Sequence, residues 1–171
     1  MDFDFPHIWI EKKYKKECFP YTASATGIRV KYDEELDAAL LEKARALVGY
    51  LRKNYYFPVR CNIAITAHKR YRSAEDGHIY YGIFYDNENL GQKRKIYPQI
   101  AVAGGLGKST EADDVLHTLL HELTHYFQWF FAENEKRTDR SLEIEATKWA
   151  SYILGDFNEF YEKSENEGEK L

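Results

Sequence analysis

The sequence predicts one domain of the α+β class, in which a helix precedes a group of strands and two further helices follow them. Apolar residues recur at helical spacing over 34–54. Three short strand-like runs follow, and helical spacing returns in two segments after residue 110. The 171 residues suffice for a single core, and no repeat or linker divides them, so we treat 1–171 as one domain.

Composition is typical of a globular chain, with 44% hydrophobic and 30% charged residues. A net charge of −4 gives no reason to expect nucleic acid or an anionic membrane as a partner. The N-terminus has no signal-peptide pattern, and no apolar run approaches membrane-spanning length. Cys18 and Cys61 lie outside any metal-type spacing and favour reduced thiols, with one disulfide as the alternative. We therefore expect a cytoplasmic protein.

The first part of the chain carries scaffold elements. Residues 1–27 mix aromatic residues with lysines and prolines, which indicates an irregular segment with a short strand near 8–10. Residues 28–32 alternate between apolar and basic, the period of a strand. Asp33 is a suitable N-cap for an amphipathic helix over 34–54.

Three strands are predicted next. Residues 59–65 alternate, 79–85 are rich in β-branched and aromatic types, and 96–103 resume after a turn. His68 and His78 flank the loop between the first two strands and are more typical of surface histidines than of metal ligands.

A glycine-rich turn at 104–110 ends in Gly-Lys-Ser and resembles a phosphate-binding loop. The full pattern needs a glycine five places before Gly107, where the chain has Val102. We therefore expect a flexible turn from strand to helix and no nucleotide site.

The functional prediction rests on the motif His121-Glu122-Leu-Thr-His125. Residues four apart lie one turn apart on one helix face, so the two histidines can share a metal ion, with Glu122 beside it as a base. Thr110 and Asp113 resemble a capping box, which places the helix start near residue 111. Apolar residues cover most of this helix, so it is expected to be largely buried. A zinc ion would give the two histidines and the glutamate a partner, which buried polar groups need.

A catalytic zinc ion takes three protein ligands, so a third must exist. No histidine follows His125, and Gln128 and Phe131 break the pattern of peptidases whose third ligand is a downstream histidine. We therefore expect a downstream carboxylate as the third ligand.

Two glutamates on the last predicted helix are candidates for that ligand. Glu143 lies about 65° and Glu145 about 95° from the centre of the apolar face, on opposite flanks. Glu143 falls on the more buried row and is preferred, with Glu145 as the alternative.

These motifs resemble a known group. His-Glu-Leu-Thr-His, followed by Glu-x-Glu-Ala-x-x-Trp-Ala-x-x-Ile-Leu on a second helix, is similar to the gluzincin class of zinc metallopeptidases, and among families to the ImmA/IrrE type. The resemblance covers residues 110–155. It implies a zincin-like fold, in which a helix and a small twisted mixed sheet precede the active-site helix and a ligand-bearing helix. It also implies one zinc ion per chain held by His121, His125 and Glu143, with Glu122 as catalytic base.

Two further residues on these helices are candidates to support the site. Thr147 stands where the resembling families have Asp or Asn, so a hydroxyl would replace the usual partner of a ligand histidine. His117, one turn before His121, is expected to support a ligand or the substrate, or to lie at the surface. Gly155 is expected to end the last helix, leaving 158–171 as a frayed acidic tail.

The sequence thus predicts a zinc-dependent peptidase that hydrolyses a peptide or protein substrate through a metal-activated water, with Glu122 as general base. Strand 96–103 could pair an extended substrate, and His78, Tyr126 and Tyr152 are candidates to stabilise the oxyanion. The alternatives are an inactive zinc-binding module that binds a protein partner or regulates transcription, and a metal-free domain. The sequence does not indicate the oligomeric state.

Overall fold

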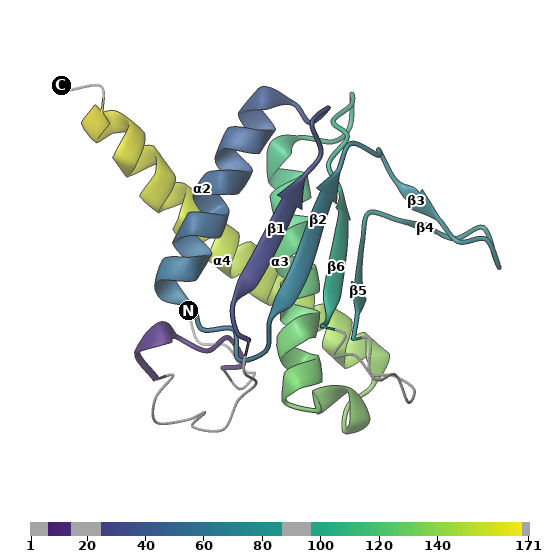
Figure 1. Cartoon of the computed structure of the whole chain (residues 1–171). Helices are drawn as coiled ribbons and strands as arrows, with labels where there is room; N and C mark the ends of the chain where they lie inside the picture. The colour runs from purple at the N-terminus through teal and green to yellow at the C-terminus, as the bar shows by residue number, and fades with distance from the viewer. Residues whose placement is uncertain (1–6, 15–24, 87–96, 169–171) are drawn as a thin grey trace.

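The computed structural model describes residues 7–14, 25–86 and 97–168 and has three helices and a small mixed sheet (Figure 1). In chain order the elements are η1 (Lys12–Tyr14), β1 (Ile28–Tyr32), α2 (Ala38–Asn54), β2 (Cys61–Thr66), β3 (Tyr71–Arg72), β4 (Ile79–Tyr80), β5 (Gly82–Tyr85), β6 (Gln99–Ala103), α3 (Ala112–Phe130), η2 (Glu133–Glu135) and α4 (Asp139–Gly168). The predicted α+β class and the order of helix, strands and two further helices are confirmed.

The main sheet has the strand order β1-β2-β6-β5. β1, β2 and β6 run parallel, whereas β5 is antiparallel to β6, so the sheet is mixed. β3 and β4 form a separate two-stranded hairpin that projects from the body (Figure 1). Because β6 is paired on both sides, the prediction that it could bind a substrate along a free edge is wrong. On this side of the sheet, the edge strand among the described residues is β5.

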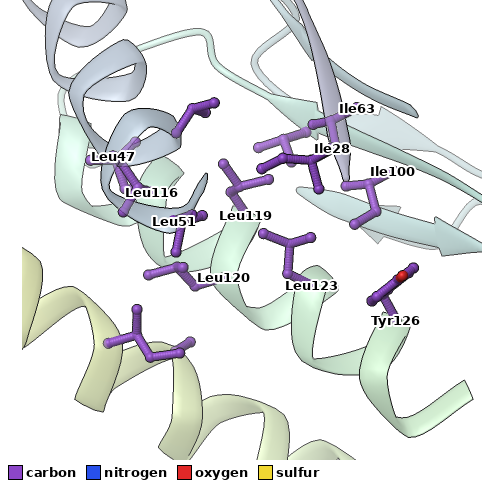
Figure 2. Close-up of a cluster of buried hydrophobic side chains, with 14 of the residues drawn as sticks. Ile28, Leu47, Leu51, Ile63, Ile100, Leu116, Leu119, Leu120, Leu123 and Tyr126 are labelled. Atoms are coloured by element: carbon purple, nitrogen blue, oxygen red, sulfur yellow. The ribbon is translucent and has the colours of Figure 1, made fainter. Parts of the chain in front are cut away.

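The core lies between one face of the sheet and the helices. Every second residue of β2 is buried, and the sheet register aligns Ile63 with Ile100 of β6. Figure 2 shows side chains from α2, α3 and the sheet meeting in this space: Ile28, Leu47, Leu51, Ile63, Ile100, Leu116, Leu119, Leu120, Leu123 and Tyr126. Strands in which every second residue is apolar, and helices with one apolar stripe, are expected where helices cover one face of a sheet.

α2 begins four residues later than predicted. Its N-cap is Asp37, whose carboxylate accepts a hydrogen bond from the Leu40 backbone N–H. The prediction of Asp33 as N-cap is wrong, because its carboxylate instead accepts from the backbone N–H groups of Glu35 and Ala67. Asp33 therefore ties the end of β1 to the end of β2.

The predicted strand over 79–85 is divided at Tyr81 into β4 and β5. The predicted short strand near residues 8–10 is wrong, since that segment is irregular but fully inserted in the core. Trp9 packs against Phe127 and donates from its indole N–H to Thr124, both on α3. Part of the 1–27 segment, including Cys18, lies outside the described residues; Cys61 is a buried free thiol.

α4 continues through Gly155 as one helix to Gly168 (Figure 1). The predictions of a helix end at Gly155 and of a frayed tail over 158–171 are wrong for the residues that the structure describes. Phe157 is buried, and the Asn158 amide donates to Asp113 on α3, so tertiary contacts favour continued helix here. Within the described ranges, no helix combines the length and apolar character needed to cross a bilayer.

Candidate metal centre

α3 begins with a capping box one residue beyond the predicted one. The Glu111 side chain accepts from the backbone of Asp114, and the Asp114 side chain accepts from the backbone N–H of Glu111. Ten residues of the helix are buried. His121 and His125 are half-buried and lie at the border of this buried face, beside α4.

The glycine-rich turn before α3 is explained by close packing of backbone. The N–H groups of Gly104 and Gly105 donate to the carbonyls of Thr66 and His68 at the end of β2. A β carbon at Gly105 would lie 2.7 Å from the Ala67 carbonyl oxygen. Both N–H groups already have backbone acceptors, which supports the prediction that the turn is not a phosphate-binding loop.

His121, His125 and Glu143 form a compact cluster that could hold a metal ion. The two Nε2 atoms lie 3.1 Å apart, and each lies 3.1 Å from one carboxylate oxygen of Glu143. Ligand atoms around a tetrahedral ion at about 2.05 Å would be separated by about 3.3 Å. The two nitrogens, and each nitrogen with its nearer oxygen of Glu143, therefore have separations close to those around a small transition-metal ion.

Of the two candidate carboxylates, Glu143 joins the cluster and Glu145 does not. The reason given for preferring Glu143 is nevertheless wrong, because its side chain is 60% exposed while that of Glu145 is fully buried. Glu145 faces inward and pairs with Arg137 at 2.8 Å. Glu143 reaches the histidines from the exposed flank of α4.

The second nitrogen of each histidine is engaged away from the cluster. His125 Nδ1 lies 2.7 Å from Gln128 Oε1, and His121 Nδ1 lies 3.4 Å from the Thr147 hydroxyl. Thr147 therefore occupies the predicted supporting position, at the long end of hydrogen-bonding distance. Burial and the neighbouring His125 lower the pKa of His121, which favours the neutral imidazole that a metal ligand must be.

Gln128 is the residue that sequence reasoning missed. In the sequence, Gln128 serves only to exclude the peptidases whose third ligand is a downstream histidine. In the structure it contacts His125 and donates to both Leu142 O and Glu145 Oε1 on α4. The signal was present in the spacing, because residues three apart lie on the same face of a helix.

Glu122 lies in a largely apolar setting and is only 8% exposed. Burial raises the pKa of its carboxyl to about 8, and the nearby charge of Glu143 adds to the increase. A hydrogen bond from the backbone N–H of Phe84, on β5, partly offsets both effects.

β5 approaches α3 closely because residue 82 is glycine. A β carbon there would lie 2.6 Å from Thr118 Cγ2 and 2.9 Å from Glu122 Oε1. A lone glycine inside an apolar strand is a signal of such close approach.

The cluster and Glu122 open into one cleft of about 720 Å³. Its walls come from the β3–β4 hairpin, β5, α3 and the start of α4, and the lining includes His78, Tyr80, Phe84, Trp129 and Leu142. Concave sites that combine aromatic walls with a few polar groups are typical of ligand binding.

Among the three candidates for stabilising an oxyanion, only His78 lines this cleft. Tyr126 is wrong as a candidate, because its hydroxyl is buried and bonded to the backbone of Val59. Tyr152 packs against Trp149 instead and does not line the cleft. His117 stays outside the cluster, with its Nε2 hydrogen-bonded to the Ser151 hydroxyl at 3.1 Å.

Comparison with known proteins finds no matching family model, no matching curated protein and no matching solved structure. The functional assignment of this chain therefore depends on the geometry of the cluster formed by His121, His125 and Glu143 and on the cleft around it.

Proposed function

We propose that this chain is a zinc-dependent peptidase with a zincin-like active site. His121, His125 and Glu143 would hold the zinc ion, and Glu122 would act as general base and acid. One observation carries the proposal: two imidazole nitrogens and a carboxylate group, close enough together to bind one metal ion, share a cleft with a buried glutamate.

The donor set fits zinc better than calcium or magnesium. Two neutral imidazoles and one carboxylate form the ligand combination of catalytic zinc sites, whereas calcium and magnesium prefer all-oxygen ligands. When bound with an open fourth position, zinc supplies Lewis-acid chemistry that polarises a carbonyl group and lowers the pKa of water toward 7.

Glu122 has the properties of a group that accepts and returns a proton. Its pKa of about 8 lies close to the pH at which proton transfer in both directions is efficient. A cation at the neighbouring histidines would favour its ionised form and so its role as base. The Phe84 N–H holds the carboxylate beside β5, and from there Glu122 could deliver the proton to the leaving amine.

β5 offers a place for the substrate backbone. It is the edge strand next to the cleft, and an extended peptide can add to such an edge by backbone hydrogen bonds. His78 and Tyr80 line the same cleft and could contact substrate side chains or a developing oxyanion. These features favour a peptide or protein as substrate.

The test is a comparison of Glu122→Gln with the wild type. We expect the variant to retain about one zinc ion per chain by elemental analysis and to lose hydrolysis of a peptide library. Glu159→Gln, on the exposed face of α4, serves as the matched control and should retain both properties. Equal hydrolysis by Glu122→Gln and wild type would remove Glu122 from the mechanism.

A second candidate function is a zinc-bound module that recognises a protein partner without turnover. The contact between Thr147 and His121 favours it, because a hydroxyl at 3.4 Å supports a ligand histidine less strongly than a carboxylate would. Zinc binding without any Glu122-dependent hydrolysis across the library would favour this candidate.

A further inference from the structure

The side chain of Gln128 makes three hydrogen bonds between the two helices that carry the cluster, using both of its N–H donors. It is 2% exposed. Its Nε2 donates to Leu142 O at 2.9 Å and to Glu145 Oε1 at 3.0 Å, and its Oε1 lies 2.7 Å from His125 Nδ1.

These contacts determine the orientation of the amide group. A backbone carbonyl and a carboxylate oxygen can only accept, so the NH2 group must face Leu142 and Glu145. The amide oxygen must then face His125, whose Nδ1 has to carry the hydrogen. In the neutral imidazole, the nitrogen without hydrogen is then Nε2, the atom that faces His121 and Glu143.

Glu145 holds Gln128 in this orientation and is itself held by Arg137. The carboxylate is fully buried, its Oε1 accepts from Arg137 Nη1 at 2.8 Å, and its Oε2 has no hydrogen-bond partner among the described residues. A buried ion pair that leaves one oxygen unsatisfied is a poor source of stability, because desolvation offsets the attraction. The ion pair is better explained by the geometry that it imposes on Gln128.

We infer that Gln128, anchored by the Glu145–Arg137 ion pair, is a positioning residue of the metal centre. It fixes His125 as the Nδ1–H tautomer, which leaves the Nε2 lone pair available to a metal ion that the cluster would hold. It also ties α3 to Leu142, the residue before Glu143, and so sets the separation of the ligands on the two helices. The second role rests on the proposed metal site, whereas the tautomer can be measured without metal.

The first experiment reads the histidine tautomers of the metal-free protein by nitrogen NMR at pH 8. We expect His125 to be the Nδ1–H tautomer in the wild type and to shift toward Nε2–H in Gln128→Met, which preserves an unbranched shape but cannot accept that hydrogen bond. An Nε2–H tautomer in the wild type would overturn the inference. Should Gln128→Met not fold, the tautomer of His125 in the wild type decides alone, because that measurement needs no variant.

The second experiment measures zinc affinity by competition with a chelator. Loss of an outer partner of a ligand histidine typically lowers metal affinity 10- to 100-fold, and we expect a loss in this range for Gln128→Met. Thr147→Val is the matched comparison and should lose less, because its contact with His121 is longer. Thermal unfolding of the metal-free variants separates loss of affinity from loss of fold.

The outcomes separate this inference from the proposed function. A wild-type protein without zinc affinity contradicts the proposed function and the second role of Gln128. Equal zinc affinity and equal His125 tautomers in wild type and Gln128→Met would overturn the inference and leave the proposed function standing. A loss of affinity in Gln128→Met without any peptidase activity in the wild type would support the inference alone.

Discussion

Gly82 on β5 lies directly against Glu122 on α3. A β carbon at position 82 would stand 2.9 Å from both Cγ and Oε1 of Glu122. The missing side chain lets β5 pack closely on α3, and the backbone N–H of Phe84 then reaches the Glu122 carboxylate. The position of the proposed base is thus set by a residue with no functional group.

The first prediction concerns Gly82→Ala. The added methyl group must displace either the Glu122 carboxylate or β5, and we expect peptidase activity to fall on the order of 10- to 100-fold, because small misplacements of catalytic groups have effects of this size. Zinc content should stay near that of the wild type, since the atoms nearest the added methyl group belong to Thr118 and Glu122 and not to the three residues of the cluster. Steady-state kinetics together with elemental analysis check both expectations; unchanged kinetics would show that this close approach has no role.

The second prediction concerns Gly155→Ala. Gly155 lies inside α4, and a β carbon there would meet nothing within 4 Å. Alanine should therefore raise the free energy of unfolding by about 0.5–1 kcal/mol, through its better helix propensity. Denaturant unfolding measures the change. A destabilised variant would mean that the helix ends at this glycine, as the sequence had suggested.

The comparison of sequence and structure shows which kinds of contact can be predicted. The spacing of His121 and His125 follows from helix geometry alone, so their convergence was predictable. Helix periodicity also placed Glu143 and Glu145 on opposite flanks, but it could not show which flank would face the core. That depends on how α4 packs against α3 and on the partner Arg137, eight residues earlier.

Two of the wrong predictions, the helix end at Gly155 and the strand near residues 8–10, share one physical cause, which is a tertiary contact that overrides a local preference. Gly155 is a common helix terminator, yet Phe157 packs in the core beyond it and extends the helix. The 8–10 segment reads as a strand, yet Trp9 is held by α3, more than a hundred residues away. No window of local sequence contains either contact.

The third prediction is a pH dependence of stability in the metal-free protein. Since folding raises the pKa of Glu122 from its ordinary value of 4.5 to about 8, the unfolded chain loses this proton at lower pH than the folded one. The contribution of the protonated carboxyl is fully present below pH 4.5 and is lost as the pH rises to about 8. The wild type should therefore lose stability across this range relative to Glu122→Gln, whose amide does not titrate.

Thermal unfolding of both metal-free proteins between pH 4 and pH 9 tests this sign. The difference between their melting temperatures should move steadily in favour of Glu122→Gln as the pH rises, and should level off above pH 8. A difference that does not change with pH would mean that Glu122 ionises in the folded protein as it does in water.

The last prediction separates the two glutamates of α4 by the size of their effects on zinc binding and on stability. Glu143 is exposed and contributes to the cluster, so Glu143→Ala should greatly weaken zinc binding while changing the stability of the metal-free protein by less than about 0.5 kcal/mol. Glu145 is buried against Arg137, and Glu145→Ala should lower the free energy of unfolding by about 3–5 kcal/mol because it breaks a buried ion pair by removing one of its partners. Chelator competition and denaturant unfolding, applied to both variants, give a two-by-two comparison. The opposite result would be loss of zinc binding in Glu145→Ala at unchanged stability, together with normal zinc binding in Glu143→Ala. Glu145 would then be the ligand, and the orientation of α4 would have to differ from the one described.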